Sequence, residues 1–145
     1  MARKIVLGNL NKAIVAIRFS QFPQLNITAD ALDEGMLSVS TQGEITSMLP
    51  TATGMIGSPN PYIAHAISFK VVKTNPLAQQ LKNQIRLSSI LGDLEITADA
   101  STLDRETYFN SFVQTYDTWT YNGKEPAIGF TIMCYEAINN SMYGA

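Results

Sequence analysis

The dipeptide Asn122-Gly123 constrains the fold of this chain more than any other local feature of the sequence. Both positions of a two-residue hairpin turn need a positive φ, and Asn followed by Gly is the pair that such turns prefer. Counting outward from the turn brings these residues opposite one another: Tyr121 and Lys124, Trp119 and Pro126, Asp117 and Ile128, Thr115 and Phe130, Val113 and Ile132. This register groups mostly apolar residues together, with Asp117 opposite Ile128 as the exception. The sequence therefore predicts a long C-terminal hairpin.

Shorter alternating runs predict that the rest of the chain is also rich in strands. Side chains of a strand point to opposite faces in turn, so apolar residues at every second position mark a half-buried strand. The runs of this kind are residues 13–19, a short stretch from 25 to 30, residues 37–40 after a turn at 33–35, residues 66–73 and residues 94–99. We expect sequential antiparallel strands.

One segment has the features of a helix. Asn75 is a favourable N-cap, Pro76 occupies the first helical position, where its missing N–H does no harm, and Gly92 is placed to end the helix. At 100° per residue the apolar side chains fall on one side of the helix. These side chains are Leu77, Leu81, Ile85, Leu87 and Leu91, whereas Lys82 and Arg86 lie outside the apolar sector. We predict a helix over residues 76–91 that packs on the sheet through Leu77, Leu81 and Ile85.

Together these elements place the chain in the mainly β class, as an α+β protein. A chain of 145 residues that is 46% hydrophobic is long enough to bury a core without disulfides or metal. We expect a single domain over residues 1–145. Its architecture is predicted to be an antiparallel β-sandwich or partly closed barrel with one flanking helix and the C-terminal hairpin.

Charge is scarce on this chain, which bears on its partners. Charged residues make up 15% of the sequence, whereas about 25% is usual for a soluble domain. Ten basic and twelve acidic residues give a net charge of -2, so the chain lacks the basic stripe of a protein that grips nucleic acid. The composition favours a surface covered in large part by other copies of the same chain.

The segment from residue 49 to residue 61 contains three prolines and two glycines. This composition argues against a regular helix or a central strand. We therefore expect a long loop or irregular arm, and such loops tend to be functional in compact domains. The candidate contacts with a neighbouring subunit are Met55, Ile56, Pro59 and Pro61. The alternative is a lid folded over the chain's own core.

No combination of residues in the sequence is typical of a catalytic, cofactor or metal site. The only histidine, His65, lies at the start of a predicted strand, and no Gly-x-Ser-x-Gly motif is present. The only cysteine, Cys134, lies in an apolar strand pattern typical of the core. One His and one Cys do not make up a zinc site. We therefore expect a protein that is not an enzyme and has no cofactor.

The sequence also contains no apolar run near the roughly 20 residues that span a bilayer. The N-terminus has only three consecutive large apolar residues, Ile5 to Leu7, before Gly8, too few for the core of a signal peptide. We expect a protein that is made in the cytoplasm and does not insert into membranes.

Six aromatic residues fall within fourteen positions of the predicted C-terminal hairpin: Tyr108, Phe109, Phe112, Tyr116, Trp119 and Tyr121. One interpretation is a stacking platform for sugars or single-stranded nucleic acid. The other is alternation between the core and a subunit interface. The absence of basic residues between positions 108 and 121 favours the second interpretation over a nucleic-acid platform.

The order of elements from residue 64 to residue 138 resembles that of a known family. The run from Ala66 to Leu81 is a strand that passes through Thr74-Asn75-Pro76 into a leucine-rich helix, followed by the strand at 94–99 and the closing hairpin. This pattern is similar to that of the tail tube proteins of contractile-tailed bacteriophages. The resemblance implies a small β-sandwich or partly closed barrel that assembles with five further copies into a hexameric ring.

The resemblance also implies partners and a location. Stacked rings would enclose a channel for the tape-measure protein and for DNA, which passes as cargo without specific binding. Other tail proteins, such as sheath and baseplate, would contact the tube, and the protein would reside in the tail of the virion. Candidate residues facing the channel are Glu95, Thr97 and Asp99, or alternatively Gln114 and Thr118. Two alternatives remain: a baseplate adaptor ring of the same fold that starts the tube, and a carbohydrate-binding β-sandwich module.

Overall fold

The computed structural model of the protein describes residues 14–98 and 104–143. The strands of these parts of the chain are β1 Val15–Phe19, β2 Leu32–Gln42, β3 Thr46–Pro50, β4 Met55–Pro59, β5 Tyr62–Val72, β6 Ile90–Ala98, β7 Glu106–Tyr116 and β8 Ala127–Ala137. The helices are α1 Pro76–Leu87 and α2 Asn140–Tyr143, and the 3₁₀ helices are η1 Pro23–Leu25 and η2 Ala29–Ala31. None of the helices in the described ranges is long and apolar enough to cross a bilayer.

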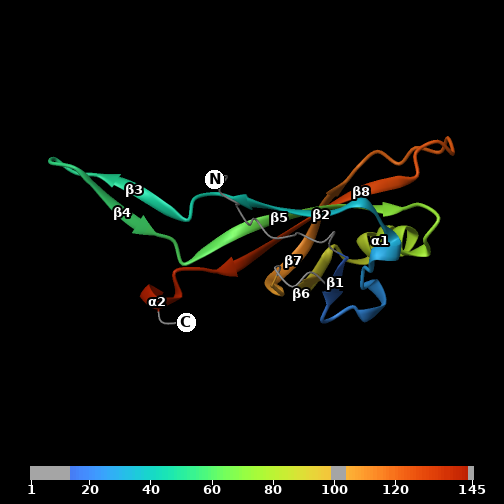
Figure 1. Ribbon diagram of the computed structural model, residues 1–145, viewed down its shortest axis with the longest axis horizontal. Helices are drawn as coiled ribbons and strands as arrows, with labels where there is room; N and C mark the ends of the chain where they lie inside the picture. Colours follow the sequence, from blue (N-terminus) through green and yellow to red (C-terminus); the bar gives the residue numbers. More distant parts are fainter. Residues whose placement is uncertain (1–13, 99–103, 144–145) are drawn as a thin grey trace, which may run out of the picture.

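Six of the strands form one antiparallel sheet in the order β1-β6-β7-β8-β5-β2. The sheet curls into an open half-barrel, with α1 at one end (Figure 1). Strands β3 and β4 form a separate two-stranded sheet that projects beyond the opposite end of the molecule. The prediction of a mainly β fold with a partly closed barrel and one substantial helix is confirmed.

One face of the six-stranded sheet, called the inner face here, holds the hydrophobic core. Residues directly opposite in paired strands share a face. The row formed by Ile67, Ile132 and Val113 on β5, β8 and β7 is therefore apolar across the middle of the sheet. The turns before β2 close one end of this core through buried Leu25, Ile27 and Ala31.

Helix α1 begins as its sequence predicts. The Asn75 side chain accepts a hydrogen bond from the backbone N–H of Leu77 at 2.9 Å, and Pro76 is the first helical residue. Leu77 and Leu81 are buried in the core, and Ile85 is partly buried against it. The three side chains expected to pack on the sheet thus lie on the side of α1 that meets the core.

The predicted end of the helix was wrong. Helix α1 ends at Leu87, and the backbone of Ser88 is already extended. Leu87 is 84% exposed, whereas Leu91 is fully buried as part of β6. Gly92 has a φ of +79° and lies at an irregularity in the pairing of β6 with β7. Leu91 fits the helical period of the sequence by coincidence, since its position also fits the alternation of the following strand.

The C-terminal hairpin consists of β7 and β8, but its register differs from the predicted one beyond Val113. Val113 pairs with Ile132 as expected, whereas Thr115 lies opposite Thr131 instead of Phe130. One extra residue, Gln114, is accommodated as a bulge in β7, and this shifts the register by one. Strand β7 then ends at Tyr116, so the unfavourable pair of Asp117 and Ile128 does not form.

Residues 117–126 form a long loop in place of a two-residue turn, and Asn122-Gly123 lies near its tip. Gly123 does have a positive φ of 69°. The loop is anchored by Lys73, whose backbone N–H donates to the Pro126 carbonyl at 2.8 Å and whose Nζ donates to the Thr120 carbonyl at 2.9 Å. The Nζ of Lys82 lies 4.3 Å from the centre of the Trp119 ring, a cation–π contact with α1. These contacts hold the loop against the helix end of the molecule.

Two predictions in the N-terminal half were also wrong. The stretch from 25 to 30 consists of 3₁₀ turns with a single bridge between Ile17 and Ile27, and it is not a strand. The turn expected at 33–35 is a bulge within β2, where Gly35 donates its N–H to the Asp33 carboxylate at 3.1 Å. Met36 there has a φ of 54°, so β2 resumes its pairing with β5 only at Leu37.

Candidate functional site

The segment expected to be an irregular arm is a regular β-hairpin made of β3 and β4. Pro50 and Pro59 are the last residues of their strands. Each strand of a two-stranded sheet has a free edge, where the missing N–H of proline removes no ladder bond. The hairpin, called the arm here and comprising residues 45–61, points away from the core (Figure 1), so the alternative of a lid over that core was wrong.

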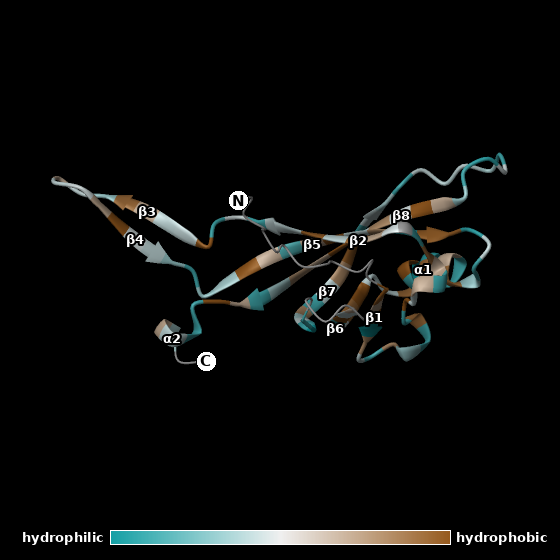
Figure 2. Ribbon diagram, viewed as in Figure 1, coloured by the Kyte–Doolittle hydropathy of each residue, from teal (hydrophilic) through white to brown (hydrophobic). Residues whose placement is uncertain are grey.

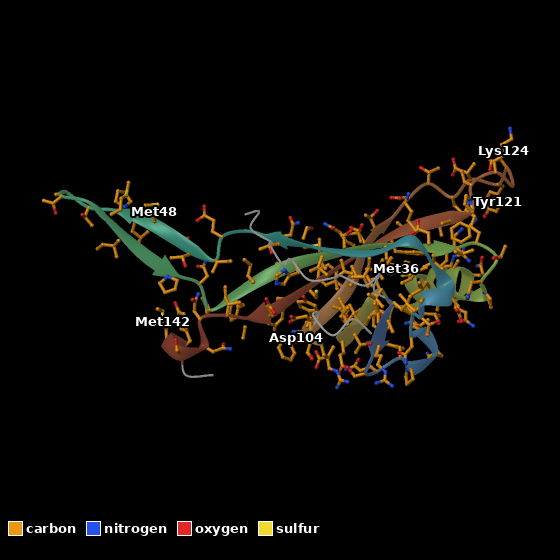
Figure 3. All side chains as sticks on the ribbon, viewed as in Figure 1. Met36, Met48, Asp104, Tyr121, Lys124 and Met142 are labelled. Carbon is orange, nitrogen blue, oxygen red and sulfur yellow. The ribbon has the colours of Figure 1, made fainter. Side chains whose placement is uncertain are left out.

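Both faces of the arm are apolar and uncovered. Pairing places Met48 and Met55 on one face, and Leu49 opposite Ile56 on the other. These four side chains are between 51% and 70% exposed. Figure 2 shows hydrophobic segments in β3 and β4, which project from the rest of the molecule. Figure 3 shows Met48 on the projecting part of the molecule. An isolated two-stranded hairpin is at best marginally stable in water, so the arm has the properties of a surface that is completed by a partner.

The base of the arm is braced by the C-terminal segment. Asn139 donates its side-chain N–H groups to the carbonyls of Asn60 at 2.8 Å and Ile45 at 3.5 Å. The hydroxyl of Tyr143, in α2, donates to the Pro59 carbonyl at 2.5 Å. Of the four residues predicted to contact a neighbour, Met55 and Ile56 are therefore exposed on the arm, whereas Pro59 and Pro61 lie half-buried at its base.

The strand that leads into the arm is an unprotected sheet edge. Strand β2 pairs with β5, and no other strand in the described residues covers its outer edge. From Leu37 to Gln42 this strand contains no charged residue and no proline, the features with which soluble proteins protect such edges from pairing. The outer edge of β1, in contrast, is partly covered, because Ile17 and Ile27 exchange two backbone hydrogen bonds of 2.8 Å.

The second face of the six-stranded sheet, the outer face, carries aromatic and apolar residues from four strands, which no single stretch of sequence brings together. Register places Ala66, Met133, Phe112 and Ile90 in one row across β5, β8, β7 and β6. The next row contains Ala64, Tyr135 and Phe109. The Tyr135 ring lies 5.9 Å from the rings of both Phe109 and Tyr62, measured between centroids. We call the six large side chains of this region the outer apolar patch: Tyr62, Ile90, Phe109, Phe112, Met133 and Tyr135.

The outer apolar patch is accessible to a partner. Tyr62 and Ile90 are more than 60% exposed, and Phe109 and Phe112 are about 40% exposed. A hollow of about 390 Å³ adjoins Tyr62 and Tyr135. None of the six side chains is charged. A contiguous apolar area on a sheet face is typical of an interaction surface rather than of scattered surface residues.

The other end of the outer face is polar. Register places Ser38, Ser68, Thr131 and Thr115 in one row there. The first three of these residues line a hollow of about 380 Å³. Asp33, Lys70 and Asp117 contribute charged side chains to the lining of that hollow. The Asp117 carboxylate lies over Gly129, where an added Cβ would approach its oxygen to 2.3 Å. The outer face is therefore divided into a polar half and an apolar half.

The residues predicted to face the channel lie outside the arm. Glu95 and Thr97 belong to β6 and are half-buried. The Glu95 carboxylate lies 3.0 Å from Nε of Arg105 and opposite Arg18 of β1, so its charge is compensated. Asp99 lies outside the described residues. Gln114 is the extra residue of the β7 bulge, and Thr118 lies in the exposed part of the β7–β8 loop.

The aromatic residues of the C-terminal region lie in several different surroundings. Tyr108 is buried on the inner face, Phe109 and Phe112 lie on the outer face, and Trp119 packs beside Lys82. Tyr121 is exposed near the tip of the loop, as Figure 3 shows. These residues therefore do not form a single stacking platform.

His65 lies within the inner face of β5 and is buried, not at the start of the strand as expected. Its Nε2 is 2.9 Å from Oε1 of Glu136 in β8, and its Nδ1 is 3.5 Å from the Thr41 hydroxyl in β2. The Tyr108 ring meets the imidazole edge-on at 5.2 Å. Hydroxyl, imidazole and carboxylate follow one another as in a hydrolase triad. The imidazole is buried among other core side chains, so we interpret the cluster as a link between the strands at the base of the arm.

Two ionisable neighbours of His65, Cys134 and Tyr108, predict a loss of stability at alkaline pH. Burial, and then the Glu136 carboxylate, raise the pKa of the Cys134 thiol from 9.0 to about 12. Burial and the same carboxylate, followed by Glu106 and Cys134, raise the pKa of Tyr108 from 10.0 to about 12. The folded chain keeps protons that the unfolded chain loses, so the free energy of unfolding should fall as pH rises from about 9 to about 12.

Urea unfolding at a series of pH values measures this effect. The Cys134→Ala variant should lose less stability than the wild type between pH 8 and pH 10, because the thiol no longer contributes. The comparison uses the change with pH within each protein, so the cavity left by the substitution cancels. A pH dependence that is identical in the two proteins would contradict the assignment to Cys134.

In the ranges 14–98 and 104–143, no group of three or more His, Cys, Asp or Glu side chains is arranged to bind a metal ion. The features that the structure brings together are instead the arm, the β2 edge and the outer apolar patch. No protein-family model matches the chain, and neither does any curated protein sequence.

Proposed function

We propose that this protein is a structural subunit of a bacteriophage tail tube, which assembles into hexameric rings that stack around a channel. The observation that carries the proposal is the unprotected edge of β2 next to an arm with two uncovered apolar faces. Both features expose groups that a soluble monomer normally covers or guards. The resemblance of residues 64–138 to tail tube proteins supplies the hexamer and the channel.

Pairing through a free sheet edge supports the proposed ring. A free edge presents unpaired N–H and C=O groups, and pairing with the sheet of a neighbour satisfies them. When each copy pairs head to tail with the next, the contacts form a closed ring if a whole number of copies completes one full turn. An edge without lysine or proline, such as Leu37 to Gln42, favours such pairing.

The proposed role is not enzymatic, and DNA passes through the channel as cargo. A net charge of -2 on the chain gives little attraction to DNA, which suits passage rather than retention. The tape-measure protein, the sheath and the baseplate are the proposed contacts of the tube within the tail of the virion.

Lysines placed on the β2 edge test the ring directly. Ser38→Lys combined with Ser40→Lys should abolish every species with the mass of a closed ring, over a wide range of concentrations, because lysine protects sheet edges from pairing. Ser68→Lys is the matched control: it lies opposite Ser38 on the same face, but one strand inward. The control should still assemble.

Negative-stain microscopy of the wild type then identifies the assembly. Stacked rings with a central channel support the tail tube, and single rings that do not stack support a baseplate adaptor ring of the same fold. A wild-type protein that remains monomeric at every concentration, also in the presence of its partner tail proteins, would refute the proposal.

A further inference from the structure

Within residues 14–98 and 104–143, two apolar surfaces are left without a partner and lie apart from each other. The arm projects beyond the end of the six-stranded sheet, whereas the outer apolar patch lies on the face of that sheet, over β5 to β8 (Figure 1). Strands β3 and β4 contact each other and make only sparse contacts with other elements. No segment of the part of the chain that the structure describes therefore covers either surface.

The two surfaces are matched in chemistry. From Ile45 to Pro61 the arm contains no Asp, Glu, Lys or Arg, and the six side chains of the patch are likewise uncharged. Burial of a charge against either surface would be unfavourable, whereas burial of one surface against the other removes apolar area from water on both sides. The methionines of the arm are flexible and suit packing against aromatic rings such as Phe112 and Tyr135.

The surfaces also have the extent that a stable contact requires. A standard protein interface buries about 800 Å² on each partner around an apolar centre. The arm offers four large side chains at half exposure or more, and the patch offers six large side chains in adjacent rows. Each therefore provides the centre of an interface.

We propose that the arm of one copy of this protein docks on the outer apolar patch of a second copy. This inference rests on the proposed self-assembly and identifies the surface that receives the arm. Because arm and patch are different surfaces, each copy offers one arm and receives another. Two copies can exchange arms about a two-fold axis, or the contact can continue head to tail from copy to copy. The proposed stack of rings requires the second arrangement.

A membrane is a less suitable occupant of the arm. Interfacial segments combine apolar side chains with lysine or arginine that meet lipid headgroups. The arm has no basic residue, and its tip is Thr51-Ala52-Thr53-Gly54, which contains no aromatic side chain. Binding to vesicles is nevertheless a distinct outcome of the experiment.

Mixing two defective variants tests the contact. The arm variant carries Met55→Asp and Ile56→Asp, one on each face of the hairpin, and the patch variant carries Phe112→Asp. A charge at the centre of an apolar interface should weaken the contact at least about thirtyfold, the effect of losing an interface hot spot. Neither variant alone should form the arm-to-patch contact in sedimentation measurements.

An equimolar mixture of the two variants should regain one arm–patch contact for each pair of unlike copies. The intact arm of the patch variant then binds the intact patch of the arm variant, and the product has no further arm–patch pair with which to grow. If sheet edges have already closed each variant into rings, the product is a pair of rings; otherwise it is a pair of chains. Thr53→Asp at the arm tip and Thr115→Asp in the polar row are matched controls that should behave as the wild type.

The outcomes separate this inference from the proposed function. If the wild type assembles and both variants assemble equally well, the arm–patch contact is refuted while self-assembly stands. A mixture that never pairs refutes the complementarity of the two surfaces. If the wild type does not assemble, the proposed function fails, but the contact can still be tested by cross-linking. Met55→Cys and Phe112→Cys, each made with Cys134→Ala, are mixed at high concentration, and dissolved oxygen accepts the two electrons and two protons of the thiols. An absent intermolecular disulfide refutes the contact. Binding of a monomeric wild type to neutral phosphatidylcholine vesicles, abolished in the arm variant, also overturns it.

Discussion

Leu81→Ala should lower the free energy of unfolding by about 2 to 5 kcal/mol. Leu81 is 1% exposed and packs in the core next to Leu77. The substitution removes buried methyl and methylene groups and leaves a cavity that neighbouring side chains fill only in part. Since a domain of this size is stable by only about 5 to 15 kcal/mol, much of the variant should be unfolded or insoluble. Urea unfolding, followed by circular dichroism, measures the loss.

Leu87→Ala is the matched control, because it makes the same change on the same helix. Leu87 is 84% exposed in the last turn of α1, so its truncation should change stability by less than about 0.5 kcal/mol. Equal losses in the two variants would contradict the observed orientation of α1. The sequence alone placed both leucines on the same apolar side of the helix, so this comparison also distinguishes the structure from the sequence-based prediction.

The helix illustrates what local chemistry predicts and where it stops. Its start is specified by Asn75 and Pro76, whose effects depend only on adjacent backbone groups. Its end depends on whether Leu91 extends the helix or joins β6, and in the structure Leu91 is buried in the sheet. A leucine satisfies helical and strand periodicity equally well, and only tertiary packing decides between them.

The hairpin of β7 and β8 shows the same limit at the level of register. Asn122-Gly123 correctly indicated a reversal of the chain between two strands, and the pair of Val113 and Ile132 was predicted. The bulge at Gln114 carries no sequence signal, yet it changes the pairing of every residue between it and the loop. Trp119 contacts Lys82, and Lys73 holds the loop through a hydrogen bond. These contacts with residues distant in sequence accompany a connection between β7 and β8 that is longer than a two-residue turn.

The candidate site depends even more strongly on register. The exposure of Met55 and Ile56 on the arm could be predicted from the sequence of that segment alone. The outer apolar patch unites four strands. The pair of Phe112 and Met133 follows from the predicted register, whereas Phe109 shares their face only because an irregularity of β7 near Asn110 shifts the pairing by one residue. The lack of charge from Leu37 to Gln42 is visible in the sequence, but the position of this strand at the edge of the sheet is set by tertiary pairing, which local sequence does not encode.

Asn139→Gly combined with Tyr143→Phe should free the base of the arm without unfolding the core. The two substitutions remove the hydrogen bonds to the carbonyls of Ile45, Pro59 and Asn60. Glycine is the suitable replacement at position 139, because this residue has a φ of 54° that alanine adopts with strain. Each such bond contributes about 0.5 to 1.5 kcal/mol, so opening of the arm should become at least about tenfold more frequent.

Limited proteolysis at a concentration where the protein is monomeric measures this opening, because cleavage within residues 45–61 requires a locally opened backbone. Asn140→Ala combined with Tyr121→Phe is the matched control: Asn140 adjoins the brace in sequence and Tyr121 is an exposed tyrosine far from the arm. The control should be cleaved at the wild-type rate, and neither double variant should shift the global urea midpoint.

If the brace variant is also cleaved at the wild-type rate, the direction of the arm is set by β2 and β5 alone. If cleavage accelerates and assembly weakens in parallel, the brace orients the arm toward its partner before the two copies meet, and the ordering cost of docking is lowered in advance.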